Sequence, residues 1–173
     1  MDRRLFLLSG LALAGCSTLP PAPQLNGAQL TLDQAFVGRK TGTGLFRVTL
    51  TGQERRFTAR LRGKLTRSGT RLTVVEDFAY NDGQKDRLTW VFDRQAASGW
   101  IGRREDTVGQ AVVTEENGAV RLAYTADFKS LSGVTRLGFQ DVIYRAGDGR
   151  IVNDAVVSRF GIPVGTVKFI IQG

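Results

Sequence analysis

The sequence predicts an all-β protein, a single antiparallel barrel of about 8–10 strands whose chain meanders from each strand to its neighbour. From residue 43 onward, turns containing glycine or asparagine recur about every 10–15 residues, and the stretches between them alternate apolar and polar side chains. The connections are too short for crossover helices, so consecutive strands should pair antiparallel. A content of 21 glycines and only 4 prolines fits many strands joined by tight turns.

Individual elements follow from the same alternation. Residues 32–37 have the apolar spacing of a short helical turn and precede the first strand. Strands are expected at residues 44–51, 55–67, 70–80, 85–94, 99–103, 108–114, 119–128, 134–145, 150–160 and 164–171.

The hairpin over residues 71–94 is specific enough to predict its register. The turn Asn81-Asp82-Gly83 suits a three-residue loop with Gly83 in the left-handed conformation. This loop places Glu76 opposite Leu88, and Asp77 opposite Arg87 on the other face. A slip of one residue would mix the two faces, so the apolar pattern selects this register. One face then carries Leu72, Val74, Phe78, Tyr80, Leu88, Trp90 and Phe92 together with Glu76.

Two carboxylates are expected on apolar inner faces. Glu76 lies on the face just described, and Asp141 shares its face with Leu137, Phe139 and Ile143. A lone inward carboxylate must be paired, hydrogen-bonded or protonated. We therefore expect a raised pKa for Glu76 unless Arg159 reaches it and keeps it charged. The other candidate partners of the two acids are Asn153, Tyr124 and Tyr144.

Three interpretations of these acids remain open. They can belong to a structural polar network that closes one end of the barrel, or they can anchor the polar group of a ligand. In the third interpretation, Glu76 with Asp106 or Asp141 forms an acid–base pair of the glycosidase type. The stretch Asp106-Thr107-Val108-Gly109 is interpreted as a tight turn.

The first residues indicate export and lipid anchoring. Arg3 and Arg4 precede a short apolar run from Leu5 to Leu13, and Leu13-Ala14-Gly15-Cys16 resembles a bacterial lipobox. This predicts a signal peptide over residues 1–15, lipidation of Cys16, a flexible tether over 16–28 and a barrel domain over 29–173. Ser17 favours the outer membrane, so we expect a protein held on its periplasmic leaflet. The paired arginines leave general secretory and twin-arginine export both open.

One strand is basic on its outer face. The segment 55–67 alternates apolar residues with Arg56, Arg60, Arg62 and Lys64. This row is a solvated surface or a contact for anionic lipid headgroups. The net charge of +8 would also suit nucleic acid, but the export signal argues against that partner.

The amino-acid composition limits the kinds of catalytic and metal site that the chain can form. The chain has no histidine and one cysteine, which leaves no imidazole base, no internal disulfide and no multi-cysteine metal site. On these grounds we expect no cofactor, no metal and no enzymatic activity, and a monomer.

A set of short stretches occurs along the chain in a specific order: Phe36-Val37-Gly38, residues 76–83, Arg87, Trp90, residues 106–111, residues 139–141, Asn153, residues 158–161 and Val164-Gly165. Together they resemble a bacterial lipoprotein family catalogued as domain of unknown function 3833. The resemblance runs from the lipobox almost to the last residue and implies a lipocalin-like barrel, with no reaction attached. Members are often encoded near enzymes that modify fatty acids. The chain departs from the family at Gln140-Asp141-Val142, where two adjacent acids and a tryptophan are usual, and at Arg159, where lysine is usual.

These observations predict a binding protein of the cell envelope. A barrel of about eight strands is either filled by side chains or holds one small ligand. We expect a lipid or another hydrophobic ligand inside it; a structural or assembly partner acting through its surface is the alternative. The predicted ligand-binding residues are Glu76, Phe78, Tyr80, Trp90, Tyr124, Phe139, Asp141, Asn153 and Arg159.

Overall fold

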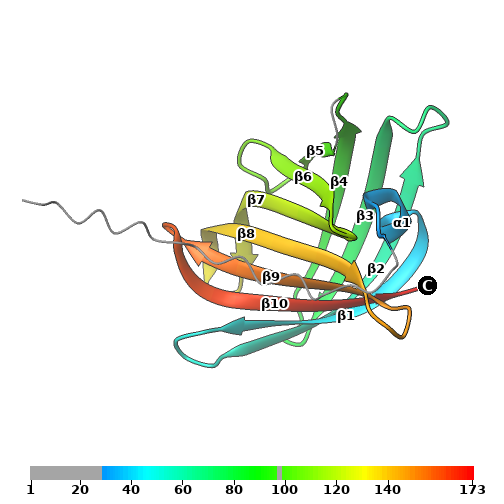
Figure 1. Ribbon diagram of the computed structural model, residues 1–173. Coiled ribbons are helices and arrows are strands. Elements are labelled where there is room, and N and C mark those ends of the chain that lie inside the picture. The colour runs from blue at the N-terminus through cyan, green and yellow to red at the C-terminus, as the bar shows by residue number, and fades with distance from the viewer. Residues whose placement is uncertain (1–28, 97–98) are drawn as a thin grey trace, which may run out of the picture.

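The computed structural model describes residues 29–96 and 99–173, which form a closed antiparallel barrel (Figure 1). Every strand pairs with its neighbours in the chain, and β1 pairs with β10 to close the sheet. The predicted signal peptide, Cys16 and the tether lie outside the described residues. The elements are α1 (Leu32–Phe36), β1 (Gly38–Val48), β2 (Glu54–Leu65), β3 (Arg71–Tyr80), β4 (Lys85–Arg94), β5 (Trp100–Arg103), β6 (Ala111–Glu116), β7 (Ala119–Ser130), β8 (Gly133–Arg145), β9 (Ile151–Arg159) and β10 (Ile162–Gln172).

The all-β fold and the meandering barrel are confirmed, and two strand starts differ from the prediction by three residues or more. β1 begins at Gly38, six residues before the expected start, because residues 38–43 pair with β2 and residues 41–43 pair with β10 as well. β6 begins at Ala111, because residues 104–110 form the β5–β6 connection. The register of the β3–β4 hairpin is the predicted one: Glu76 faces Leu88, and Asp77 faces Arg87. Gly83 has φ of 87°, as its turn requires.

The short helix α1 closes one end of the barrel. Its side chains Leu32, Ala35 and Phe36 are buried. The carboxylate of Glu115 accepts hydrogen bonds from the backbone N–H of Leu32 at 2.8 Å and from Trp100 Nε1 at 3.0 Å. A Cβ on Gly63 would collide with the carbonyl oxygen of Phe36, so glycine lets the end of the helix lie directly against β2.

The two ends of the barrel therefore differ. In an antiparallel meander, alternate turns lie at opposite ends. The β2–β3, β4–β5, β6–β7 and β8–β9 connections share the end that α1 covers, called the closed end here. The β1–β2, β3–β4, β5–β6, β7–β8 and β9–β10 connections share the other, called the open end. In Figure 1 the β1–β2 and β9–β10 hairpins lie opposite α1.

Packing is densest towards the closed end. Trp100, Phe92, Leu72 and Ile143 are at most 1% exposed there. Towards the open end, Phe46, Phe57, Phe78, Tyr80 and Phe128 are only partly buried. No helix within the described ranges is long and apolar enough to cross a bilayer.

Candidate functional site

The open half of the barrel contains a cavity of about 520 Å³. Its wall is aromatic: Phe57 lies 5.6 Å from Phe78 and 5.3 Å from Phe169 between ring centroids, and Tyr124 stacks on Phe139 at 4.8 Å. The volume falls in the usual range of small-molecule sites, and an apolar wall with a few polar groups is their usual composition. The interior is thus not filled by side chains.

A buried polar cluster forms the inner part of this cavity. Glu76 on β3 and Asp141 on β8 are only 6% and 4% exposed. Arg104 lies between the acids and the aromatic wall, with its guanidinium carbon 4.7 Å from the ring centroid of Trp90 and 5.3 Å from that of Tyr124. The polar cluster, defined as Glu76, Arg104, Asp106, Tyr124, Asp141 and Asn153, lines the cavity.

The β5–β6 connection delivers Arg104 to the interior. Thr107 holds the turn through its Oγ1, which accepts from the backbone N–H of Arg104 at 3.0 Å and donates to the Arg104 carbonyl at 2.8 Å. The carbonyl of Asp106 accepts from the N–H of Asp127 at 2.8 Å and ties the turn to β7. The carboxylate of Glu105 accepts a hydrogen bond from the backbone N–H of Thr89 at 2.6 Å. This bond ties the turn to β4, just before the residues 91–94 that pair with β5. The hydrogen-bonded turn spans residues 104–107 and so begins two residues before the predicted turn at 106–109. Its first residue, Arg104, is the one cation of the polar cluster.

Arg104 is already engaged by its neighbours. Its Nε and Nη2 donate to the two carboxylate oxygens of Asp106 at 2.6 and 3.0 Å. Its Nη1 lies 3.6 Å from Glu76 Oε2, beyond hydrogen-bond length. Burial opposes the charge of Arg104, but Tyr124, Glu76 and Asp106 together raise its pKa, so it stays protonated. Asp106 therefore neutralises Arg104 and is not a free base.

The two remaining acids, Glu76 and Asp141, have pKa values close to physiological pH, so each is only partly ionised there. Burial raises the pKa of Glu76 to about 7, although Arg104 counteracts part of the increase. Burial likewise raises the pKa of Asp141 to about 7, against the attraction of Arg104 and a hydrogen bond from Asn153. Among the described residues, Asn153 Oδ1 is buried without a hydrogen-bond partner. The polar cluster thus offers more acceptor groups than the protein's own donors satisfy.

Eight of the nine sequence-predicted site residues line this cavity; Arg159 does not. The expectation that Arg159 faces the interior is wrong: it ends β9 at the open end, exposed, with its guanidinium carbon 5.2 Å from the Phe160 ring centroid. Arg104 takes the place expected for it. Tyr144 is not a partner of the acids either, since its hydroxyl donates to Asp154 at 2.9 Å. The signal for Arg104 was its position two residues before Asp106, just outside the stretch 106–111 already singled out from the sequence.

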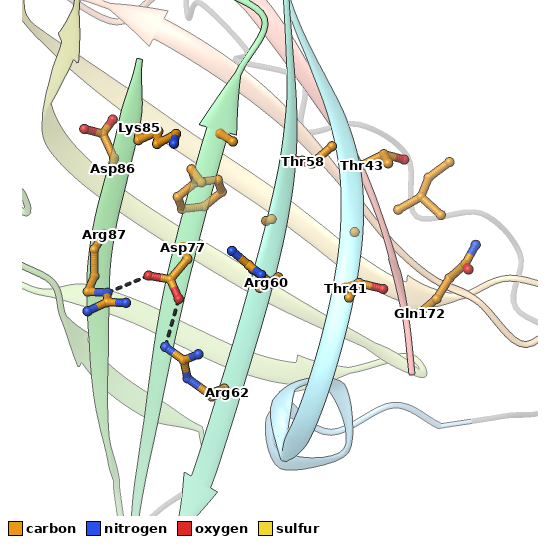
Figure 2. Close-up of a pocket in the computed structure, with 15 residues that line it drawn as sticks. Thr41, Thr43, Thr58, Arg60, Arg62, Asp77, Lys85, Asp86, Arg87 and Gln172 are labelled. Carbon is orange, nitrogen blue, oxygen red and sulfur yellow. Dashed lines mark hydrogen bonds and ion pairs between the residues drawn. The ribbon is translucent and has the colours of Figure 1, made fainter. Parts of the chain in front are cut away.

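A second hollow lies on the outer face of the barrel over β1–β4 and β10, and its lining includes threonines and charged side chains (Figure 2). In it, Asp77 accepts from Arg62 at 2.8 Å and from Arg87 at 2.5 Å. Arg56 likewise pairs with Glu54 at 2.8 Å. The predicted basic row on β2 is therefore partly neutralised by its own neighbours. Its arginines Arg62 and Arg87 are exposed and pair with Asp77, whereas the interior cavity contains buried acids, so the interior cavity is the better candidate site.

No three histidine, cysteine, aspartate or glutamate side chains converge as a metal site within residues 29–96 and 99–173. The polar cluster places the cation Arg104 among its acids. The arrangement suits recognition of an organic group by hydrogen bonds.

The family described as Protein of unknown function (DUF3833) matches residues 10–173. The chain belongs to this family. No curated protein matches the sequence significantly. The barrel is similar to the structure of the S-type phycobiliprotein lyase CPES from Guillardia theta. The two share 9% sequence identity, with a TM-score of 0.54 over 78% of this chain and 85% of that one.

The likeness concerns the fold, and it corrects one prediction. We expected no enzymatic activity, from the lack of histidine and of a reactive cysteine in the domain. A protein named as a lyase has the same barrel, so that expectation does not stand for this DUF3833 member. The likeness also agrees with the lipocalin-like barrel expected from the sequence.

Proposed function

We propose that this DUF3833 protein is a lipid-anchored protein of the bacterial cell envelope whose barrel binds a small amphiphilic ligand. The observation that carries the proposal is the cavity of about 520 Å³, aromatic along its wall and acidic in its inner part. Buried acids at the inner end of an apolar cavity are costly for folding alone. Their cost is offset when a ligand supplies the missing donors.

The polar cluster favours a ligand that donates hydrogen bonds or carries a basic nitrogen. Asp106 already neutralises Arg104, so little attraction remains for an anionic headgroup. Glu76, Asp141 and Asn153 Oδ1 are left as acceptors. The ligand class is thus an apolar body with an amine or another N–H group.

The anchor is proposed from the sequence. Leu13-Ala14-Gly15-Cys16 supports cleavage before Cys16 and its lipidation, and Ser17 supports the outer membrane, on the periplasmic side. Two or more acyl chains give stable anchoring where one is marginal. Radiolabelled palmitate in cells should label the wild-type chain and not Cys16→Ser. Label on both chains would refute the anchor.

Ligand binding is tested with N-phenyl-1-naphthylamine, a neutral aromatic amine whose fluorescence rises in apolar surroundings. We expect saturable binding of one probe per protein. Val167→Phe should abolish it, because Val167 lines the cavity. The matched control is Val112→Phe, which adds the same ring to the exposed outer face of β6 and should leave binding unchanged. Equal binding by both variants would exclude the cavity as the site.

The headgroup preference is tested by displacing this probe with dodecylamine or dodecanoate, which share one chain and differ in the sign of charge. Dodecylamine should displace it at least about tenfold more effectively, and Glu76→Gln with Asp141→Asn should remove the difference. Stronger displacement by dodecanoate would make Arg104 the headgroup contact and overturn the acidic preference. The cavity assignment would survive that outcome.

A further inference from the structure

Large apolar side chains are exposed mainly at the open end of the barrel. Leu50, in the β1–β2 turn, is 93% exposed, and Phe160, in the β9–β10 turn, is 90% exposed. Leu131, Val134 and Ile162 are also well exposed at this end. By contrast, Val37 at the closed end and Val112 on the side of β6 are isolated. Scattered exposed apolar residues are normal, but a cluster on one face marks a contact surface.

The exposed residues are contiguous around the rim. They belong to the β7–β8, β9–β10 and β1–β2 hairpins, which follow one another in the closed sheet. Figure 1 shows the β1–β2 and β9–β10 hairpins projecting on the side away from α1. The β3–β4 turn, Asn81-Asp82-Gly83, is polar. We call Leu50, Leu131, Val134, Phe160 and Ile162 the apolar rim.

Phe160 is in a conformation that phenylalanine does not favour. It forms a two-residue turn with Gly161, because Arg159 pairs with Ile162 across it. Its φ is 52° and that of Gly161 is 78°. Such turns prefer asparagine or glycine at the first position, and a bulky residue at positive φ is an outlier. The Phe160 ring is not buried either. Neither the turn geometry nor packing therefore explains an aromatic ring at this tip.

Cations flank the same tips. Arg159 lies beside the Phe160 ring, and Lys129 comes just before Leu131. Both are exposed, and neither has an ion pair within residues 29–96 and 99–173. Apolar tips beside unpaired lysine and arginine match a bilayer surface, where the tips enter the acyl boundary and the cations meet anionic headgroups.

We propose that the apolar rim inserts into the surface of an anionic lipid bilayer, so that the open end of the barrel faces the membrane. The barrel then stands on the bilayer with α1 directed away from it. The cavity mouth, lined by Arg55, Phe128, Lys129 and Val134, opens at this end, so a membrane-dissolved ligand could enter without crossing water. Entry of a ligand from the membrane rests on the proposed function, whereas insertion of the apolar rim into the bilayer does not.

Depth-dependent quenching tests the proposal on the full chain bound to vesicles of phosphatidylethanolamine and phosphatidylglycerol. Phe160→Trp and Leu131→Trp each place a fluorophore in the rim. Val112→Trp places one on the side of the barrel as the control. Native Trp90 and Trp100 are buried and give a constant background. Lipids with brominated acyl chains should quench and blue-shift the emission of both rim variants and leave that of Val112→Trp unchanged.

The outcomes separate the possible occupants of the rim. Quenching of neither rim variant on vesicle-bound protein would show that only the chain before the barrel contacts lipid, and would overturn the proposal. A blue shift without vesicles that grows with protein concentration would identify a second copy as the occupant, and would overturn it too. Equal quenching of all three variants would show adsorption without a preferred orientation, and would overturn the proposal as well.

A second variant distinguishes loss of membrane contact from loss of folding. Phe160→Asn restores the residue type that the turn prefers, so the barrel should be at least as stable as the wild type. In the background of Leu131→Trp, the same change should reduce quenching by brominated lipid. Unchanged quenching in this stable double variant would remove Phe160 from the contact and contradict the proposed orientation.

Discussion

Replacing Glu76 by glutamine should make the protein more stable at alkaline pH, although it removes a charge 3.6 Å from an arginine. Glutamine has the shape of the protonated acid. Arg104 keeps its two hydrogen bonds to Asp106, so the substitution does not leave a buried cation unpaired. The effect therefore depends on the cost of ionising Glu76 in its buried position.

That cost follows from the pKa of Glu76. Folding raises it from 4.5 to about 7, which is equivalent to about 3 kcal/mol of unfolding free energy. Because the folded state binds the proton more tightly, the free energy of unfolding falls as pH rises from about 4.5 through 7. Asp141 acts in the same direction, from 3.8 to about 7. Glu76→Gln should match the wild type near pH 5 and exceed it by up to about 3 kcal/mol near pH 8.5.

Urea unfolding at intervals from pH 5 to 8.5 measures this difference. The chain has no histidine, so no imidazole titrates in this window. Glu116→Gln, whose acid is 53% exposed, is the control and should follow the wild-type pH profile. Destabilisation of Glu76→Gln by a few kcal/mol at pH 8.5 would show that Glu76 is an ionised partner of Arg104, and would refute the reasoning.

Three further perturbations test other parts of the structure. Arg104→Met should cost about 3 kcal/mol at pH 8.5, because it leaves Asp106, whose side chain is only 10% exposed, without its cation. A urea midpoint equal to that of the wild type would contradict the role given to Arg104. Phe160→Asn should raise stability by about 1 kcal/mol in the same assay by relieving the positive φ, and a loss of stability would mean that the ring packs in solution. Gly63→Ala should lower the melting temperature measured by circular dichroism, because the added methyl group forces α1 away from β2. An unchanged melting curve would mean that the helix does not pack against β2 at Gly63.

Local pattern was sufficient for much of the fold. Alternation and turn chemistry act between residues close in the chain, so the strands, the antiparallel order and the β3–β4 register could be predicted. The inward position of Glu76 followed from that register alone, since turning it outward would also expose Val74 and Phe78. The family was recognisable from short stretches in a specific order, and residues 10–173 match it.

Only the tertiary structure decided which charges meet inside the barrel. Arg104 sits in a connection, where no alternation fixes the direction of a side chain, and it reaches Glu76 because β5 ends at Arg103 and the next turn folds onto β7. Arg159 is the last residue of β9 and its side chain is exposed. At a strand end, the alternation of inward and outward side chains no longer fixes the direction of a side chain. Ring closure between β1 and β10 and the approach of α1 to Gly63 join residues far apart in the sequence. Those long-range contacts determine the interior volume, and they leave a cavity in the open half of the barrel. The sequence pattern shows only that the inner faces of the strands are apolar, and it does not show whether their side chains fill the interior.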